Sequence, residues 1–390
     1  MIDLSRARDE LGPLVVGALP DDEILDRYTR VLWNILTEPG DRAAGQLVGA
    51  VGPAEAFERV RRDDLGDGIL DPDDARAAVE RWRPRLRSGA VSAALRTARA
   101  ARLRLLTPHD ETWPDSVDDL AEHGPLVLWV RGDPRVLESA QHGVAIVGAR
   151  AATSYGEHVA GEMAAELAAC GISIVSGAAF GIDAAAHRAT LAGRGTTVAL
   201  MAGGLERAYP QAHTELIERI ADTGAVVSEV APGSAPTKWR FLQRNRLIAA
   251  LSAVTVVVEA GWRSGSLNTA HHASALGRPI GAVPGPVTSA ASAGCHRLLR
   301  ELEATCVTNA ADVRELLGWG ELPDEGGSAD SSAHTSDRTR VRDALSSRSA
   351  RTPEEIAQRC GLSVTDVQSH LGLLQVEGLV VAIAGGWRLT

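Results

Sequence analysis

From residue 144 onward, short apolar runs alternate with longer segments in which apolar residues recur at helical spacing. The apolar runs predict strands at residues 144–148, 172–176, 197–202, 225–230, 254–259 and 279–283. The segments between them predict helices at residues 155–170, 182–193, 211–222, 240–251 and 266–277. Strands that are apolar along their whole length and alternate with helices are typical of a parallel sheet covered on both faces. We therefore predict a doubly wound, mainly parallel α/β fold, with residues 126–130 as a strand that leads into it.

Ahead of this region the pattern is helical. Apolar positions at helical spacing predict helices at Ile24–Leu36 and Ala43–Val51. The Ala-, Arg- and Glu-rich stretch at residues 72–101 is also helical in character, and Pro84 and Gly89 are expected to divide it into two pieces. Residues 1–105 are thus predicted to form a small helical module, followed by a sheet domain over residues 106–317.

Residues 318–337 are rich in Gly, Ser and Asp without periodicity, and they predict a linker. Residues 338–390 predict three short helices followed by a β-hairpin, which is the pattern of a winged-helix domain. The expected helices lie at 340–347, 352–360 and 363–377, and the strands at 379–383 and 387–389. Seven Arg against five Asp and Glu give residues 338–390 a net charge of only +2. Binding of duplex DNA and binding of protein therefore both stay open for this domain.

Composition limits the classes of function. The 390 residues carry a formal net charge of −10, so any nucleic-acid site has to be a local basic patch on an acidic protein. Four cysteines without a C-x-x-C pair argue against a disulfide scaffold or structural zinc, and they favour a reduced compartment. No apolar run reaches the roughly 18 residues needed to span a bilayer, and the N-terminus does not read as a signal peptide. We expect a cytoplasmic, soluble protein without membrane contact.

The chain's one lysine, Lys238, opens its most distinctive local patch. Cations, aromatic residues and an amide are interleaved in the run KWRFLQRNR at residues 238–246. Cations neutralise phosphates, and an aromatic face offers an unstacked base a surface to lie on. The run therefore predicts contact with nucleic acid or phosphate. The competing interpretation is an amphipathic helix with solvated arginines and with Phe241 in the core.

Glycine-rich turns after two of the predicted strands are candidate phosphate sites. Gly148–Arg150 follows the first strand, where backbone N–H groups, a helix N-terminus and the Arg150 side chain would meet one phosphate. The G-x-G-x-x-G fingerprint is absent, so neither NAD nor another cofactor is predicted. Ser264–Ser266 follows the fifth strand and has the composition of an anion-binding nest, although no Walker A loop occurs. A tight turn with a surface arginine, and a plain capped helix start, are the alternative interpretations.

The second predicted strand ends in Ser176-Gly177, and Asp183 and His187 follow it at helical spacing. A nucleophilic triad of Ser176, His187 and Asp183 is conceivable, but the G-x-S-x-G elbow is missing. Helix capping by Asp183 and a polar contact by His187 are the preferred interpretation. A zinc site is disfavoured because no third ligand is spaced near them. We therefore predict neither a catalytic residue nor a metal site.

Taken in order, these motifs resemble the DNA-processing protein A family (DprA, also called Smf). The resemblance is dense from about residue 105 to 305, and several short motifs in the right order are more specific than any one of them. The motifs are Val147–Arg150, Ser176-Gly177 with Gly181-Ile182-Asp183 and His187, Tyr209-Pro210, Ser228-Glu229, Phe241 with Arg244-Asn245-Arg246, Glu259 with Ser264-Gly265-Ser266 and Thr269-Ala270, and Val283-Pro284-Gly285.

This resemblance implies an extended Rossmann-like core that dimerises and binds single-stranded DNA without sequence preference. It implies a helical module of the SAM or helix-hairpin-helix kind before the core and a winged helix after it. The expected role is to protect incoming strands in natural transformation or recombination, to displace single-strand-binding protein and to load the RecA recombinase, without catalytic activity.

The resemblance also implies roles for single residues. Arg150 and Lys238 would neutralise phosphates, and Phe241 would lie against a base. Further along the same helix, the groove would be continued by Arg244, Asn245 and Arg246. A phosphate pocket would be formed by the remaining motif residues, which are Gly148, Ser176, Gly177, Ser264, Gly265 and Ser266.

The chain departs from the family pattern at Phe180, where the family often has Arg, and at His296 and Asn268. One expected phosphate contact is therefore in doubt. Two other classes of protein share parts of this pattern. A Rossmann-like nucleotide phosphoribohydrolase of the lysine-decarboxylase-like type is disfavoured, because no glutamate follows the glycines in the turn at residues 259–273. A nucleotide-sensing winged-helix regulator would be expected to prefer duplex DNA over single strands.

Overall fold

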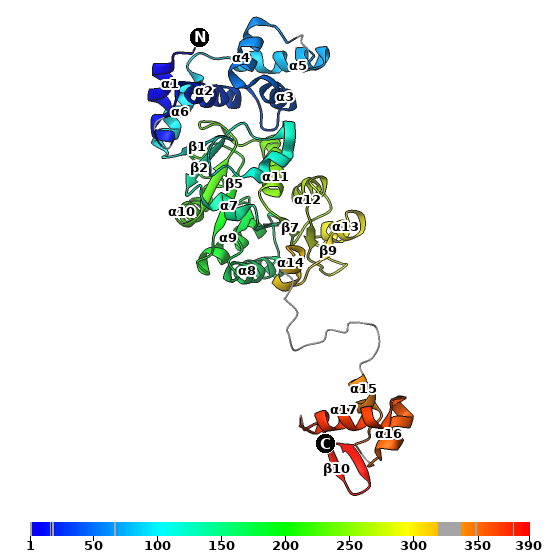
Figure 1. Ribbon diagram of the computed structural model, residues 1–390. Coiled ribbons are helices and arrows are strands. Elements are labelled where there is room, and N and C mark those ends of the chain that lie inside the picture. Colours follow the sequence, from blue (N-terminus) through cyan, green and yellow to red (C-terminus); the bar gives the residue numbers. More distant parts are fainter. Residues whose placement is uncertain are drawn as a thin grey trace. The chain divides into compact units, whose positions relative to one another are not determined.

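The computed structural model describes residues 2–15, 17, 19–65, 68–318, 337–347, 349–376 and 378–390. The chain forms two compact units, residues 1–322 and 323–390 (Figure 1). The predicted boundary near residue 105 lies inside the first unit, so the helical module and the sheet are packed together there. Of the predicted linker, residues 319–336 lie outside the described part of the chain.

The first hundred residues form a helical head, as predicted. Its core centres on Trp33 and Trp82, whose ring centroids lie 5.0 Å apart in an edge-to-face arrangement. Pro84 lies in a 3-10 turn and Gly89 adopts a left-handed conformation before the next helix, so the stretch at residues 72–101 is divided where the sequence indicated. The helices are α1 (Leu4–Leu11), α2 (Asp21–Leu36), α3 (Arg42–Val51), α4 (Pro53–Arg62), α5 (Pro72–Trp82) and α6 (Ala90–Ala100).

After the head, the chain forms a mainly parallel sheet, which confirms the predicted fold class. Among the described residues, the strands follow the order β1-β2-β6-β5-β4-β3-β7-β8-β9. β1 and β2 run antiparallel to their neighbours, and the other adjacent pairs are parallel. The strands are β1 (Arg104–Leu106), β2 (Leu128–Gly132), β3 (Val144–Val147), β4 (Ile174–Ser176), β5 (Thr197–Met201), β6 (Ala225–Ser228), β7 (Val254–Val257), β8 (Ile280–Ala282) and β9 (Thr305–Cys306).

Helices cover both faces of this sheet, as the apolar strands require. The helices are α7 (Val136–Ala140), α8 (Ser154–Ala169), α9 (Ile182–Ala192), α10 (Thr214–Thr223), α11 (Lys238–Ala250), α12 (Ser266–Ala275), α13 (Ala293–Glu301) and α14 (Ala310–Leu316). The α11 helix begins two residues earlier than predicted, because the side chain of Thr237 caps it by accepting a hydrogen bond from Arg240 N at 3.2 Å.

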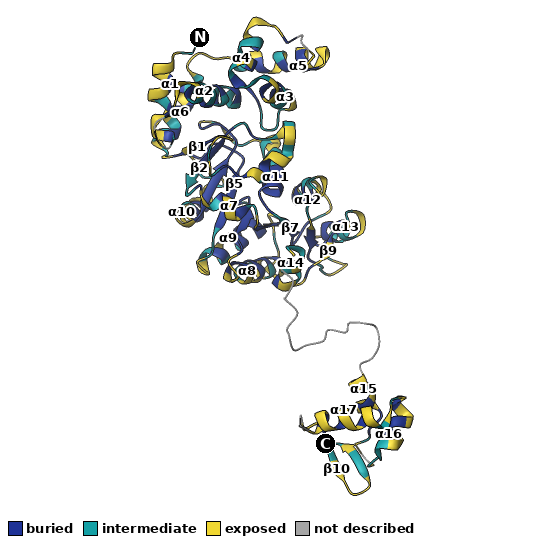
Figure 2. Ribbon diagram, viewed as in Figure 1, coloured by how far each residue is buried: buried dark blue, intermediate teal, exposed yellow. Residues whose placement is uncertain are grey.

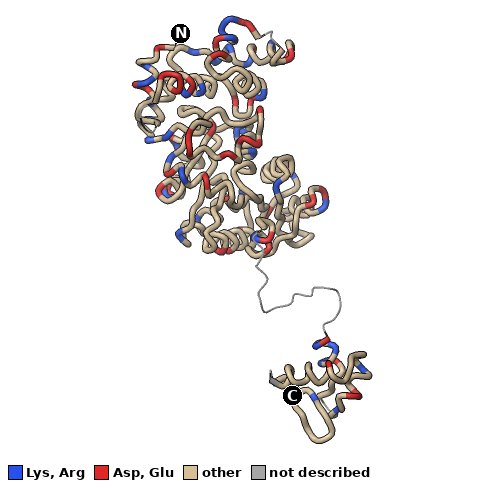
Figure 3. Tube along the Cα trace, in the orientation of Figure 1, with Lys and Arg blue, Asp and Glu red and all other residues tan. Residues whose placement is uncertain are grey.

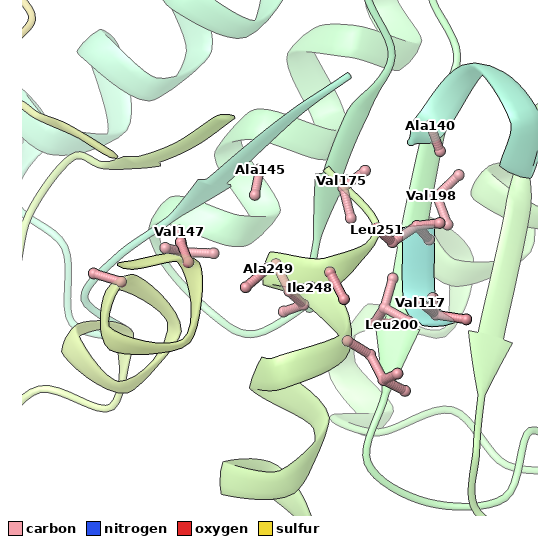
Figure 4. Packing of buried hydrophobic residues seen from close by; sticks show 14 of the residues in the cluster. Val117, Ala140, Ala145, Val147, Val175, Val198, Leu200, Ile248, Ala249 and Leu251 are labelled. Atoms are coloured by element: carbon pink, nitrogen blue, oxygen red, sulfur yellow. The ribbon is translucent and has the colours of Figure 1, made fainter. Parts of the chain in front are cut away.

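Alternate residues along each strand face opposite sides of the sheet. On one side, Ala145, Val147 and Val198 pack against the carboxyl-terminal half of α11 (Figure 4). On the other side, Val144 and Ile146 pack against apolar residues of α8. Figure 2 shows the result, with buried strands between helices whose outer faces are exposed. The second half of α11 is thus part of the core, whereas its first turn projects beyond it.

The second unit has the predicted winged-helix pattern. Three helices, α15 (Asp337–Asp343), α16 (Pro353–Cys360) and α17 (Val364–Val376), precede a hairpin of β10 (Val380–Ile383) and β11 (Gly386–Leu389). α16 starts with a capping box in which Thr352 and Glu355 bond reciprocally. In neither unit does the described chain contain a helix long and apolar enough to cross a membrane.

Candidate nucleic-acid interface

The candidate residues gather where the parallel strands end. From β3 the chain builds the sheet outward in one direction through β4, β5 and β6, and then returns to place β7 on the other side of β3. In doubly wound sheets, ligands bind at such a switch point, beyond the carboxyl ends of the strands. The loop after β3 carries Arg150, and the loop after β7 carries Ser264–Ser266.

Phe241, on the first turns of α11, lies at the centre of an aromatic and cationic cluster. The Arg150 guanidinium carbon lies 4.7 Å from the centroid of the Phe241 ring, which is within cation–π range. The Tyr209 ring, from the loop after β5, lies 5.5 Å from Phe241 between ring centroids. Phe241 is half-buried and Arg150 is exposed, so the cluster faces solvent. Three segments far apart in sequence therefore combine an open cation with aromatic surface.

Lys238 adds a second open cation beside this cluster. It is the first residue of α11 and is exposed, and it lies three positions before Phe241, so the two side chains share a helix face. Neither Lys238 nor Arg150 forms a salt bridge to any described acidic residue. A helix N-terminus also favours anions. Basic and acidic positions are interspersed over the first unit (Figure 3), so these two exposed cations without a salt bridge form a local positive site on an acidic protein.

Arg244 lies beneath the Phe241 ring and is buried. Its Nη1 donates to the carbonyls of Gly177, at 2.9 Å, and Leu200, and so bridges the ends of β4 and β5. Burial lowers the pKa of Arg244 to about 10, although the nearby Asp183 carboxyl opposes that shift. A side chain at position 177 would overlap the guanidinium, which explains the glycine there. Arg244 therefore supports the rim from below, and direct contact with DNA by it stays a prediction.

Asn245 and Arg246 point to other partners. Asn245 Nδ2 donates to the carbonyl of Gly265 at 3.1 Å and so ties α11 to the turn after β7. Arg246 forms a buried ion pair with Glu229 on the side of the helical head. Successive helical residues turn by about 100°, and the buried side chains of residues 244–246 accordingly bond to three different parts of the protein. Their contact with DNA stays a prediction.

The predicted phosphate-pocket residues divide into two sets. Ser264 is partly exposed and its hydroxyl lies 2.7 Å from that of Ser266, at the start of α12, while Gly265 between them is exposed. Ser176 is fully buried, and its hydroxyl donates to the carbonyl of Ile146 at 2.6 Å. The Ser176 side chain therefore connects β4 to β3 within the protein and does not face the pocket in this structure.

An internal carboxylate occupies the start of α8. Glu259 Oε2 accepts from Thr153 N at 2.8 Å, and Glu259 Oε1 accepts from the Thr153 hydroxyl at 2.6 Å. The Gly148 backbone lies close to the Glu259 backbone, since a Cβ added to that glycine would lie 2.9 Å from the Glu259 carbonyl oxygen. In dinucleotide-binding folds a phosphate sits at this first βα turn. Here a protein carboxylate takes that position, a feature that sequence reasoning missed although Glu259 was part of a recognised motif.

Asp183 and His187 form hydrogen bonds with other residues and none with the Ser176 side chain. Asp183 accepts from Gly177 N at 3.2 Å and Ala179 N at 3.3 Å, and burial raises its pKa. His187 Nδ1 lies 2.7 Å from the Thr197 hydroxyl, and burial lowers the pKa of this imidazole to about 3. The hydrogen bonds thus assign each group a structural partner. Among the described residues, no three His, Cys, Asp or Glu side chains are grouped to hold a metal ion.

Two aromatic residues on the rim were not predicted as site residues. Tyr209 packs on Phe241, and its signal in the sequence was the Tyr209-Pro210 pair after a glycine turn. Phe180 is 46% exposed and its ring lies 4.5 Å from that of His213. The position where an arginine was expected therefore presents an aromatic surface to solvent.

Comparison with known proteins gives consistent matches. Residues 104–318 match the family model of DNA recombination-mediator protein A, and residues 327–386 match that of the DprA winged helix domain. The chain is 44% identical over 375 residues to a Mycobacterium tuberculosis protein described as a DNA processing protein DprA, which covers 92% of this chain and 93% of the relative.

Two solved structures are also similar. DNA processing protein A from Streptococcus pneumoniae aligns with a TM-score of 0.60 and 31% identity, over 74% of this chain and 97% of that one. DNA processing protein A from Helicobacter pylori, whose structure concerns its single-stranded DNA binding mode, aligns with a TM-score of 0.50 and 31% identity, over 56% of this chain and 97% of that one.

Proposed function

The chain belongs to the DprA family of DNA recombination-mediator proteins, and on that premise we propose that it binds single-stranded DNA without sequence preference. The observation that carries the proposal is the Arg150 guanidinium, 4.7 Å from the Phe241 ring, with the exposed Lys238 on the same helix face. This arrangement combines what a single strand requires, namely cations for its phosphates and an aromatic surface for a base.

The same chemistry explains the absence of sequence preference. An aromatic ring accepts the face of any base, and cations recognise the phosphates that all nucleotides share. On the other side of the rim, the Ser264–Ser266 turn presents hydroxyl groups and the N-terminus of α12 to a neighbouring phosphate. Asn245 connects the two sides through the Gly265 carbonyl, so the strand would cross a preformed surface.

The wider role that we propose follows from the family. The protein would coat incoming or exposed strands, displace single-strand-binding protein and load the RecA recombinase, acting as a homodimer in the cytoplasm during natural transformation or recombination. No catalytic step is proposed, because Ser176, Asp183 and His187 are each held by structural hydrogen bonds.

For the winged-helix unit we propose contact with protein in preference to duplex DNA. Winged-helix and helix-turn-helix domains read duplex DNA with a helix that enters the major groove, and phosphate contacts supply much of the affinity. The corresponding helix, α17, contains no Lys or Arg. It instead exposes Leu373 at 55% relative accessibility.

One titration tests the proposed function. The full chain is titrated against fluorescently labelled oligo-dT and against a duplex of equal length, at several salt concentrations, with and without RecA. We expect the single strand to bind more tightly, with an affinity that falls as salt rises, and RecA filament formation to be faster in the presence of the protein. Preference for the duplex, or indifference to both, would contradict the proposal.

A further inference from the structure

Trp239 is exposed on the first turn of the helix that carries Lys238 and Phe241. Its relative accessibility is 55%, although tryptophan is the side chain with the largest apolar surface. The ring lines a pocket of about 360 Å³ between the start of α11 and the helical head. The head contributes residues 38–43, Gln46 and two residues of α5, Asp74 and Arg81, to its walls. None of the motifs that identify the family includes this tryptophan or this pocket.

The helix directs Trp239 and Phe241 to different sides. Successive residues turn by about 100°, so these two side chains point about 160° apart, and Lys238 lies between them. Gln243, four residues after Trp239, lies on the same face and lines the same pocket. A DNA strand that leaves the Phe241 ring and passes over Lys238 therefore reaches Trp239 next.

The pocket suits an uncharged ring better than a phosphate, because its arginines are already paired with carboxylates and its exposed Asp74 carboxylate, which has no partner among the described residues, would repel a phosphate. Glu38 pairs with Arg240, with Oε2 2.9 Å from Nε, and also with Arg85. Asp41 accepts from the Trp82 indole N–H at 3.0 Å. Arg42 pairs with Glu122 at 3.2 Å. The uncharged polar groups that line the pocket include the partly exposed side-chain amides of Gln46 and Gln243, which both donate and accept hydrogen bonds.

We infer that the pocket beneath Trp239 is a second base subsite, which takes an unstacked nucleobase of the strand whose neighbouring segment lies on Phe241. The indole supplies the stacking surface, and the amides of Gln46 and Gln243 meet the base edge. Amides can serve as donors or acceptors, so the subsite accepts any base. The inference rests on the proposed single-strand binding and extends it from the rim of the sheet onto the helical head.

The experiment compares Trp239→Ala and Trp239→Phe with the parent chain on a series of oligo-dT of increasing length. The parent should gain affinity in two steps as the strand first covers Phe241 and then reaches Trp239. Trp239→Ala should lack the second step and bind long strands about tenfold more weakly, while short strands bind as before. Trp239→Phe keeps an aromatic face and should restore most of the second step. Trp262→Ala is the matched control, because Trp262 is also exposed but its face is covered by Arg297 at 5.4 Å.

The outcomes separate the inference from the function on which it rests. If the parent fails to bind oligo-dT, the proposed function is wrong. If the parent binds and Trp239→Ala matches it at every length, or weakens short and long strands equally, the second subsite is refuted while single-strand binding stands. Free thymidine monophosphate is finally tested as a competitor of labelled oligo-dT. Competition by the mononucleotide as strong as that of an equal nucleotide concentration of oligo-dT would identify a nucleotide site and overturn the strand subsite.

Discussion

Glu229 and Arg246 form a buried ion pair that joins α11 to the end of β6. Both side chains are almost fully enclosed, with 6% and 3% accessibility. Glu229 also accepts from Gly40 N at 3.3 Å through its carboxylate and from Asn34 Nδ2 at 2.6 Å through its carbonyl. One residue at the end of β6 thus holds both α11 and two segments of the head. The junction thus lies on the same helix as Trp239 and holds Gly40, which lines the pocket beside that ring.

Loss of the carboxylate at this junction should destabilise the first unit. Glu229→Ala leaves the Arg246 charge buried without a partner, which costs about 3–5 kcal/mol in comparable buried pairs. We expect a clear fall in the midpoint of urea unfolding followed by circular dichroism. Glu162→Ala is the control, since Glu162 is an exposed partner of His158 and should change the midpoint little. Equal effects of the two substitutions would show that the junction contributes no special stability.

The two open cations should account for part of the salt dependence of binding. Lys238→Ala combined with Arg150→Ala removes two phosphate contacts, so affinity should fall and the slope of log K against log salt should flatten by roughly one to two ions. Gel-shift titrations at several salt concentrations measure both quantities. Arg188→Ala with Arg219→Ala removes two exposed arginines from α9 and α10 and serves as the control. An unchanged affinity for the first double variant at fixed salt would show that the groove lies elsewhere.

The Phe241 ring should contribute stacking energy. Phe241→Ala is expected to weaken single-strand binding by ~1–3 kcal/mol, because the base loses its aromatic surface and Arg150 loses the ring on which it lies. Phe241→Tyr keeps the ring and should retain most of the affinity. Thermal unfolding is measured in parallel. A variant that unfolds would assign Phe241 to core packing, and a folded variant that binds normally would remove it from the interface.

Gly177 should not tolerate a side chain. Gly177→Ala would place a methyl group on the Arg244 guanidinium, whose hydrogen bonds join the ends of β4 and β5, so overpacking should cost about 1–3 kcal/mol of stability. Single-strand affinity should fall with it, because Arg244 supports Phe241 from below. Gly49→Ala is the control, since Gly49 lies in α3 with no atom within 4 Å of the added carbon. That change should stabilise the helix slightly. An unaffected Gly177→Ala protein would show that Arg244 moves freely.

The buried His187 should make stability depend on pH. Its pKa is about 3 in the folded protein, below the ordinary value of 6.5, because burial disfavours the imidazolium. The unfolded chain therefore binds the extra proton between these two values, and stability should fall as the pH decreases from about 6.5 toward 3. His187→Gln should flatten this dependence by up to about 1.4 kcal/mol per pH unit, measured from urea midpoints between pH 7 and 5. His158→Gln, at an exposed position, should leave the slope unchanged. An identical slope in both variants would mean that His187 is not the responsible group.

Most of the secondary structure followed from local pattern. The strands β3 to β8 lie where uninterrupted apolar runs predicted them, because a strand covered on both faces has no polar side. The parallel edge strand β9 was not predicted, because it has only two residues and both are exposed. Two head helices escaped prediction. α1 and α4 are short and largely polar, and although the few residues that they bury recur at helical spacing, such as Ala7 and Leu11 in α1, so few apolar residues give little signal in the sequence. Their position is decided by packing against α2.

The sequence by itself determined the fold class, the family, and the segments that carry the cations, the aromatic residues and the glycine turns. Residue type and spacing are local properties, and they are legible without coordinates. Only the tertiary structure decided which of these side chains meet. It brought Arg150 onto Phe241 from a loop about ninety residues away, turned Arg246 inward to Glu229, and placed Glu259 at the start of α8. The physical reason is that helix rotation and strand order distribute neighbours in sequence to different partners and bring distant residues together.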